Sequence, residues 1–134
     1  MLAKITPCFE NGKLGVARNL KNGIGFGSSE YIVFRTKGEI IPDYLFYFLS
    51  RDQFRKEGKK EMAGAVGHKR VSKDFIENYR LPFSKSIAEQ QRIVAKLDTL
   101  SEETKKLENI YKQKLANLEE LKKSILKKAF SGEL

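Results

Sequence analysis

The clearest hydrophobic pattern lies in the last third of the chain, where apolar residues recur at alternating steps of four and three. Eight of the eleven positions in this repeat are apolar, which is typical of a coiled-coil heptad. We call these eleven positions the seam: Ile93, Leu97, Leu100, Thr104, Leu107, Tyr111, Lys114, Leu118, Leu121, Ile125 and Lys128. The pattern predicts one helix from about residue 87 to about residue 130.

This predicted helix is too long to be covered by the rest of the chain. Ser86 and Glu89 have the spacing of a capping box at its start, and neither Pro nor Gly follows until Gly132. A helix of that length runs roughly 65 Å at 1.5 Å per residue, which exceeds the extent of a small domain. We therefore expect a dimer interface, with a solvent-bridging single helix as the alternative. The expected interface comprises Ile93, Leu97, Leu100, Leu107, Tyr111, Leu118, Leu121 and Ile125.

Lys114 is the most costly exception in the seam, because an unpaired buried ammonium group is strongly unfavourable. Two explanations stay open at the level of sequence. Either the seam drifts toward Ile110 and Leu115, or Lys114 pairs with an acid on the facing helix.

The first part of the chain has the glycines, prolines and short hydrophobic segments of a small domain that mixes strands and helices. Alternation predicts short strands at residues 2–6, 13–18 and 30–35. A helix is predicted over residues 42–58, and Ser72 is expected to cap a second, short helix. All ten glycines except Gly132, and all three prolines, lie before residue 87. The sequence thus predicts an α+β fold, with a small domain of short strands and helices at 1–85 and a long coiled-coil-forming helix at 86–134.

Three glycines at alternate positions, Gly23, Gly25 and Gly27, suggest a phosphate-binding loop at first sight. Such a loop presents its backbone amides at the start of a following helix. Here the segment after Gly27 alternates as a strand does and carries no Gly-Lys-Ser/Thr motif. We interpret the three glycines as a structural turn that permits positive backbone angles and close backbone approach.

The basic excess of the chain is concentrated before the long helix. The net charge is +9, and residues 1–86 hold 16 Lys and Arg against 9 Asp and Glu. A Gly-flanked loop between Arg51 and Lys73 could place cations on phosphates and an arginine on a guanine edge. A solvated charged face is the alternative. The candidate DNA-binding residues are His68, Lys69, Arg70, Lys59, Lys60 and Lys73.

No coherent catalytic set is apparent. His68 has no nucleophile or carboxylate at a telling spacing, and the lone cysteine, Cys8, has no second thiol with which to share a metal. Asp43 followed by Glu57-Gly58-Lys59 loosely matches a nuclease pattern, which needs carboxylates that converge on one cation. We expect no metal, no cofactor and no membrane segment, and a cytoplasmic protein.

Several motifs, taken in chain order, resemble the specificity (S) subunit of type I restriction-modification enzymes. They are "LAKITPCFENGKLG", "NGIGFGSSEYIVFR", "IPDYLFYFL", "HKRVS", "LPFSKSIAEQQRIVAKLD" and "LKKSILKKAFSGEL". The resemblance covers essentially the whole chain. The glycine-rich turn, the "EQQRIV" helix start and the "AFSGEL" ending are together far more specific than any one of them.

This resemblance implies a target recognition domain followed by a long helix. In that family an S subunit carries two recognition domains, and their helices pack antiparallel as a spacer between two DNA half-sites. The S subunit catalyses nothing. It directs a methyltransferase (M) subunit, which methylates adenine from S-adenosylmethionine, and in the full complex a restriction (R) subunit that uses ATP.

Two departures from the family shape our expectations. The chain holds one recognition unit, and it begins at "MLAKITPCFENG", which the resemblance places well inside the recognition domain. We expect a truncated, non-enzymatic specificity subunit that binds double-stranded DNA and forms a homodimer through antiparallel C-terminal helices. The alternative is an assembly or regulatory fragment that binds the M subunit or a full S subunit through its helix without reading DNA.

Overall fold

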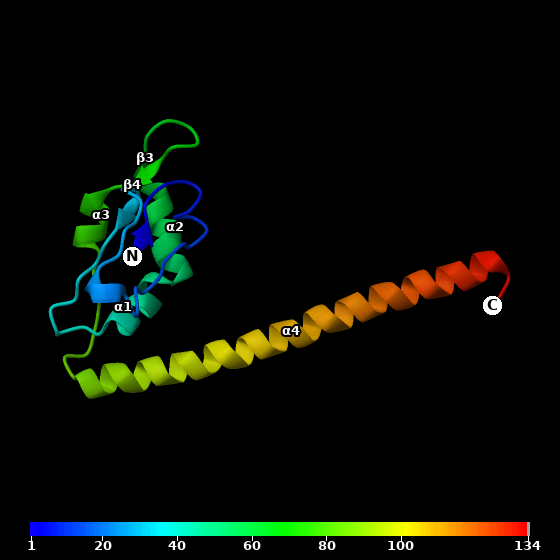
Figure 1. The fold of residues 1–134 in the computed structure, drawn as a ribbon. Helices are drawn as coiled ribbons and strands as arrows, with labels where there is room; N and C mark the ends of the chain where they lie inside the picture. Colours follow the sequence, from blue (N-terminus) through cyan, green and yellow to red (C-terminus); the bar gives the residue numbers. More distant parts are fainter. Residues whose placement is uncertain (134) are drawn as a thin grey trace. The chain divides into compact units, whose positions relative to one another are not determined.

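Short segments near the N-terminus pair into two small antiparallel ladders. The computed structural model describes residues 1–133. Strand β1 (Leu2–Ala3) pairs with β2 (Tyr31–Ile32), and β3 (Met62–Ala63) pairs with β4 (Arg70–Val71). An isolated bridge between Ile5 and Arg70 joins the two ladders, so the first residues of the chain run between both. These strands and the helices described below give an α+β fold (Figure 1).

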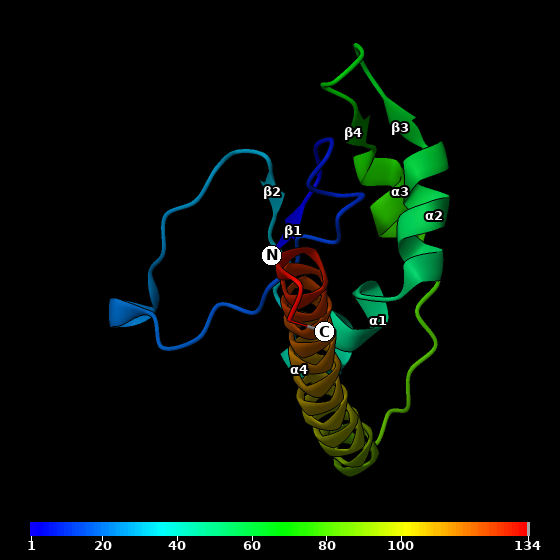
Figure 2. The ribbon, with the colours of Figure 1, turned by 90° about the vertical axis from the view of Figure 1, so that its right-hand side faces the viewer.

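The strands are shorter than the sequence predicts. Those expected at 2–6 and 30–35 contain β1 and β2, whereas the strand expected at 13–18 is wrong except for one bridge between Leu14 and Leu2. After Gly15, whose amide donates to the Met1 carbonyl, the chain leaves the ladder. It makes a wide excursion and returns at β2 (Figure 2). Alternation in the side chains alone does not reveal that residues 16–18 lack a neighbouring strand.

Two helices replace the single helix predicted over residues 42–58. They are α1 (Pro42–Leu49) and α2 (Asp52–Lys60), and Arg51 between them is extended, with φ −62° and ψ 138°. The Arg51 side chain stabilises this break, because its Nε donates to the Phe48 carbonyl and its guanidinium lies 3.8 Å from the Phe48 ring centroid. A basic residue thus satisfies a carbonyl at the end of α1.

The short helix predicted after Ser72 is confirmed as α3 (Lys73–Asn78). The Ser72 hydroxyl accepts a hydrogen bond from the Phe75 amide at 3.0 Å, which satisfies one of the free donors in the first turn. A one-turn 3₁₀ helix, η1 (Lys21–Gly23), interrupts the excursion between β1 and β2.

The hydrophobic core lies where the two ladders meet α1, α2 and α3. Its buried members are Leu2, Phe9, Phe48, Leu49, Phe54, Met62 and Val71. Phe54 is the centre of an aromatic cluster, since its ring lies 4.9 Å from Tyr79, 5.7 Å from Phe75 and 5.9 Å from Phe9. Gly58 is required by this packing, because a Cβ there would stand 2.4 Å from the Phe9 Cζ.

The long helix, α4, spans Ile87–Ser131 and confirms the helix predicted from the heptads. Its predicted capping box is half formed. The Ser86 hydroxyl accepts from the Glu89 amide at 3.3 Å, while the Ser86 amide donates to the Ser84 hydroxyl instead of to Glu89. None of the helices over residues 1–133 is long and apolar enough to cross a membrane.

The chain divides into two compact units, Met1–Val94 and Ala95–Leu134. The first two turns of α4 belong to the first unit, where Gln90 and Val94 are buried. The Gln90 side-chain amide donates to the carbonyls of Glu39 and Ser84 and accepts from the Ile41 amide, at 2.8, 2.7 and 2.9 Å. A fully buried polar side chain thereby fastens the start of the helix to the globular unit.

Candidate nucleic-acid interface

The β3–β4 hairpin carries two of the candidate DNA-binding residues on an exposed loop. Its base is anchored because Met62 and Val71, which face each other across the ladder, are buried in the core. Its loop, residues 64–69, exposes the Val66 side chain at 93% together with His68 and Lys69. The two views of the ribbon agree that this hairpin projects from the globular unit (Figures 1 and 2).

The hairpin loop has a defined shape. The His68 amide donates to the Ala65 carbonyl at 3.0 Å, and the Thr6 amide donates to the Lys69 carbonyl at 2.9 Å. Gly64 is needed here, since its φ of +128° is left-handed and a Cβ would stand 2.9 Å from the His68 carbonyl oxygen. Because the loop is already ordered, little conformational entropy is lost when its side chains bind a partner. Neither strand of this hairpin is predicted from the sequence, where the segment has the pattern of a loop.

Arg70 is held by Glu30, a residue that the sequence analysis did not single out. Its Nε and Nη2 donate to the Glu30 carboxylate at 2.7 to 3.2 Å, and its Nη1 donates to the His68 carbonyl at 3.1 Å. The hydrogen bond from Arg70 lowers the pKa of Glu30, and the same bond raises the pKa of Arg70. The fork of hydrogen bonds therefore ties the hairpin to the segment before β2.

Most of the other candidate cations already have an acidic neighbour. Lys73 pairs with Glu77 at 3.0 Å, and Lys59 lies 3.9 Å from Glu10. Both lysine side chains are about two-thirds exposed or more. Such pairs contribute little to stability, so a phosphate group can compete for these lysines. Lys60 lies at the end of α2 and is also exposed.

The carboxylates of the nuclease alternative are engaged in separate places. Asp43 pairs with Arg18. Glu57 accepts hydrogen bonds from the Tyr79 hydroxyl at 2.7 Å and from the Gln53 amide at 2.9 Å, and the Tyr79 bond lowers the pKa of Glu57. Within residues 1–133 no group of three or more His, Cys, Asp or Glu is placed to hold a metal ion. This geometry gives the nuclease alternative no support.

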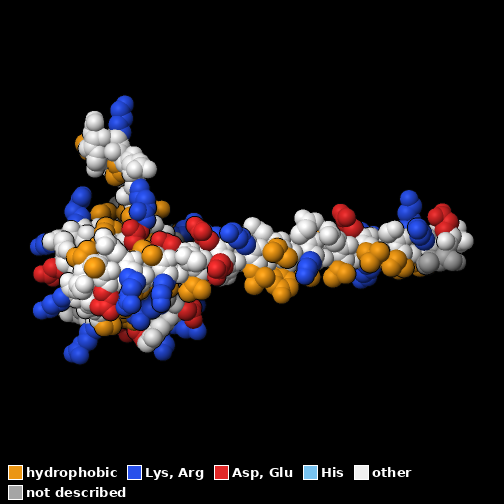
Figure 3. Space-filling model, turned by 90° about the horizontal axis from the view of Figure 1, so that it is seen from below, with side chains coloured by type: hydrophobic (Ala, Val, Ile, Leu, Met, Phe, Trp, Pro, Cys, Tyr) orange, Lys and Arg blue, Asp and Glu red, His pale blue; other side chains and the backbone are white. Residues whose placement is uncertain are grey.

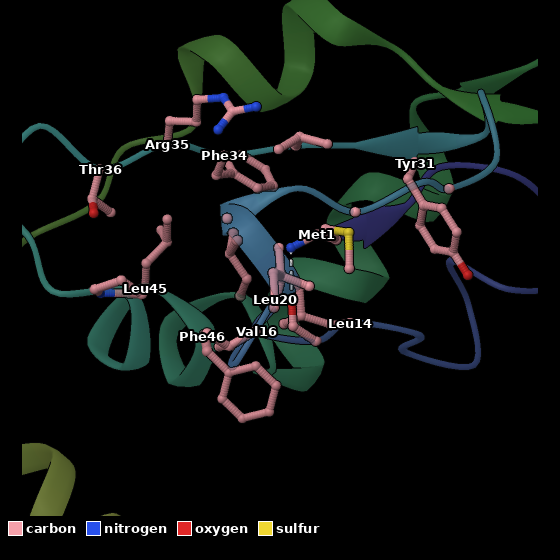
Figure 4. A pocket seen from close by; sticks show the side chains of 18 of the residues that line it. Met1, Leu14, Val16, Leu20, Tyr31, Phe34, Arg35, Thr36, Leu45 and Phe46 are labelled. Carbon is pink, nitrogen blue, oxygen red and sulfur yellow. Dashed lines mark hydrogen bonds between the residues drawn. The ribbon is translucent and has the colours of Figure 1, made fainter.

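The three glycines of the predicted turn line an open apolar pocket of about 440 Å³ (Figure 4). Only Gly23 has a positive φ, at +69°, where it ends η1. At Gly25 and Gly27 a Cβ would meet the side chains of Leu20 and Tyr31 at 3.4 to 3.6 Å, which is close to ordinary contact. We expected close backbone approach at all three glycines. At Gly25 and Gly27 the nearest atoms belong to side chains, so this expectation is wrong for these two positions.

The seam of α4 is exposed over the second unit. Leu100 is 57% exposed and Leu121 is 55% exposed, whereas Ile93 and Leu97 are partly covered. Figure 3 shows hydrophobic side chains gathered along one side of this helix. The exposed apolar residues of the second unit are Leu100, Leu107, Ile110, Tyr111, Leu115, Leu118, Leu121, Ile125, Leu126 and Phe130. Ile110 and Leu115 widen the stripe beside Lys114.

Comparison with known proteins decides the family. A family model described as the type I restriction modification DNA specificity domain matches residues 9–120. The chain belongs to this family. The match takes in the β3–β4 hairpin of the specificity domain and most of α4. The family resemblance inferred from the sequence motifs is thus confirmed.

Two curated relatives come from Escherichia coli. The chain is 43% identical over 100 residues to the type I restriction enzyme EcoAI specificity subunit, and 40% identical over 100 residues to the type I restriction enzyme EcoEI specificity subunit. Each alignment covers 74% of this chain and 17% of the relative, so the chain spans less than a fifth of the relatives it matches. No solved structure matches the chain at a significant level.

Proposed function

We propose that this chain is a DNA sequence-specificity subunit, or half-subunit, of a type I restriction-modification enzyme. The observation that carries the proposal is the specificity-domain match, which spans both the exposed basic hairpin and the long helix. Residues 1–85 form a partial target recognition domain, and residues 86–134 form a spacer and dimerisation helix. The subunit is non-catalytic, works in the cytoplasm, and directs an adenine methyltransferase subunit, with or without a restriction subunit, to its DNA site.

The DNA-binding surface is centred on the β3–β4 hairpin. His68 and Lys69 reach the duplex from its loop, and Lys59, Lys60 and Lys73 bind phosphates from the neighbouring ends of α2 and α3. Arg70 serves the surface as a positioning residue, since its guanidinium is occupied by Glu30 and by the His68 carbonyl. This role replaces the direct guanine contact that the sequence alone suggests for Arg70.

Two copies of the chain associate through α4. The exposed stripe between Leu100 and Ile125 is too large an apolar surface to leave in water. A pair of chains related by a two-fold axis would present two recognition units to a DNA site that is itself two-fold symmetric.

DNA binding is tested by fluorescence anisotropy with a random duplex at about 50 and about 200 mM salt. We expect affinity to fall steeply with salt. Lys69→Ala should weaken binding and reduce the slope of log K against log salt by about 1, because one phosphate contact is lost. Lys37→Ala is the matched control, since Lys37 is an exposed lysine outside the surface. No binding at about 50 mM salt would overturn the DNA-binding proposal.

The non-catalytic role is tested by mixing the chain with the methyltransferase subunit of a type I system. Transfer of a labelled methyl group to DNA is expected only when both proteins are present. Transfer by the chain alone would contradict the assignment.

One observation favours a second candidate function, an assembly or regulatory fragment that binds an M subunit or a full S subunit without reading DNA. Arg70, Lys59 and Lys73 all have acidic neighbours within the globular unit, which lowers the charge available to phosphates. This candidate predicts co-purification with the M subunit and no binding to duplex at low salt.

A further inference from the structure

The polar residues of the seam carry information about how two copies of α4 meet. We propose that the two helices pair antiparallel in a single register, with the two-fold axis beside Asn109, fixed by a polar layer of Lys114 against the partner's Thr104. The inference rests on the dimer proposed above and adds its register. It concerns only the second unit, between Leu97 and Leu121.

In an antiparallel pair about Asn109, residues equidistant from Asn109 in the sequence face each other. Four pairs of seam residues are equidistant from Asn109 in this way. The spacing is two residues for Leu107 and Tyr111, and five residues for Thr104 and Lys114. It is nine residues for Leu100 and Leu118, and twelve residues for Leu97 and Leu121. Every apolar seam residue in this span therefore faces an apolar residue of the partner. The two polar seam residues of this span, Thr104 and Lys114, face each other.

The other arrangements compatible with the heptads give Lys114 a less favourable neighbour on the partner helix. A slip of one helix by one heptad sets Lys114 opposite the partner's Tyr111 in one direction and opposite the partner's Leu97 in the other. A parallel, in-register pair places Lys114 directly against the partner's Lys114. Each alternative buries an ammonium group against an apolar or like-charged neighbour, which is costly. The register about Asn109 is the one of these that avoids the cost.

The polar layer can satisfy Lys114. The Thr104 hydroxyl donates to its own Leu100 carbonyl at 2.7 Å, which leaves the hydroxyl oxygen free to accept from an ammonium group. Glu103 precedes Thr104 and adds a carboxylate at the edge of the same layer. Lys114 Nζ already lies 5.7 Å from the Tyr111 ring centroid, on the side of the helix that carries the seam. This arrangement corresponds to the second explanation for Lys114, with the partner's Glu103 as the acid on the facing helix.

Charges near the axis are compatible with this arrangement. Glu108 lies one residue from Asn109 and would approach its own copy, but its carboxylate is bound by Lys112 at 2.8 Å. Ile110, on the other side of Asn109, would approach the partner's Ile110 and extend the apolar contact. The paired span from Leu97 to Leu121 is about 36 Å long at 1.5 Å per residue.

Disulfide trapping distinguishes the registers. In a Cys8→Ser background, the double variant Leu100→Cys/Leu118→Cys should give a covalent dimer on a non-reducing gel after mild oxidation. The single variants Leu100→Cys and Leu118→Cys are the matched controls and should stay uncrosslinked. A disulfide within one chain is excluded, because the two positions are about 27 Å apart along one helix.

A second pair keeps the test independent of one substitution. Leu97→Cys/Leu121→Cys should crosslink by the same rule, again only as the double variant. Crosslinking of the single variants would indicate a parallel pair and overturn the register, and so would failure of both double variants in a protein that is dimeric by light scattering. A monomer by light scattering would remove the dimer and the register together, whereas loss of DNA binding would leave both intact.

The polar layer itself is tested by Thr104→Leu/Lys114→Leu. This variant should remain dimeric but lose its unique register, so that crosslinking through Leu100→Cys/Leu118→Cys falls at least about twofold while new crosslinked species appear. An unchanged crosslinking yield and pattern would show that the layer does not set the register.

Discussion

The globular unit and the second unit use apolar residues in opposite ways. Phe54 is fully buried among aromatic rings of the globular unit, whereas Leu100 on the long helix is more than half exposed. Both residues follow a hydrophobic pattern that is regular in the sequence. A regular hydrophobic pattern therefore defines a surface to be covered, and the covering surface need not lie in the same chain.

The largest expected effect is on the core of the globular unit. Phe54→Ala removes a ring that touches Phe9, Phe75 and Tyr79, and we expect the free energy of unfolding to fall by about 3–5 kcal/mol. Urea denaturation followed by tyrosine fluorescence measures it. Phe26→Ala is the matched control, since Phe26 is fully exposed, and it should have little effect. Equal losses in the two variants would contradict the assigned core.

The second prediction concerns the seam. Leu100→Asp/Leu107→Asp places carboxylates in the proposed dimer interface, and the dimer dissociation constant should rise at least about 100-fold, which is about 2.7 kcal/mol. Light scattering over a range of concentrations measures this. Asn109→Asp/Ala116→Asp adds the same charge on the outer face of the helix and should leave the dimer in place. A dimer that survives the first pair of changes would remove the coiled-coil assignment.

The third prediction concerns the junction between the globular unit and the helix. Gln90→Ala leaves the Ile41 amide and the carbonyls of Glu39 and Ser84 without their partner. Loss of these part-buried hydrogen bonds should cost about 1–3 kcal/mol, and thermal denaturation should show this loss. Gln91→Ala changes an exposed neighbour and should be close to neutral. Protease sensitivity around residues 84–90 should rise in the first variant alone.

The fourth prediction separates two roles for Arg70. If Arg70 positions the hairpin, Arg70→Ala and Glu30→Gln should weaken DNA binding to a similar degree, about 3- to 10-fold, because either change opens the same fork. If Arg70 contacts a base, Glu30→Gln should release it and strengthen binding. Anisotropy titrations of both variants at one salt concentration decide between these results.

The smallest expected effect is the pH dependence of the Glu30 pair. Arg70 lowers the pKa of Glu30 below its ordinary value, so the stabilisation is present while the carboxylate is charged and is lost as the pH falls through the lowered pKa. The unfolding midpoints of the wild-type chain and Glu30→Gln should differ slightly at neutral pH and converge as the pH falls below the ordinary pKa of a glutamate and through the lowered pKa of Glu30. A gap that stays constant over this range would show that the pair does not stabilise the fold.

The elements that the sequence predicts well are those whose signal is local. The Ser72 cap and the length of α4 depend on residues a few positions apart, and both predictions are confirmed. The predicted strand at 13–18 was wrong because its existence depends on a neighbouring strand far away in the sequence. The helix break at Arg51 depends on one side chain that folds back on Phe48.

The residues of the candidate site also differ in whether a local sequence signal predicts them. Lys69 and His68 could be proposed from charge and from the flanking glycines, Gly64 and Gly67. Glu30 could not, because it lies 40 residues from Arg70 and no periodicity connects them. The Gly-x-x-Gly spacing between Met62 and Val71 was nonetheless a usable signal for the hairpin, since both glycines have positive φ.

The buried amide of Gln90 has a consequence for every salt titration of this protein. An amide carries no formal charge, so its bonds to Glu39, Ile41 and Ser84 are neither screened by ions nor lost on protonation. Phosphate contacts weaken as salt rises, while the attachment of the first turn of α4 to the globular unit does not. A loss of DNA affinity at high ionic strength would therefore report on the proposed DNA-binding surface, with the join to the helix still intact.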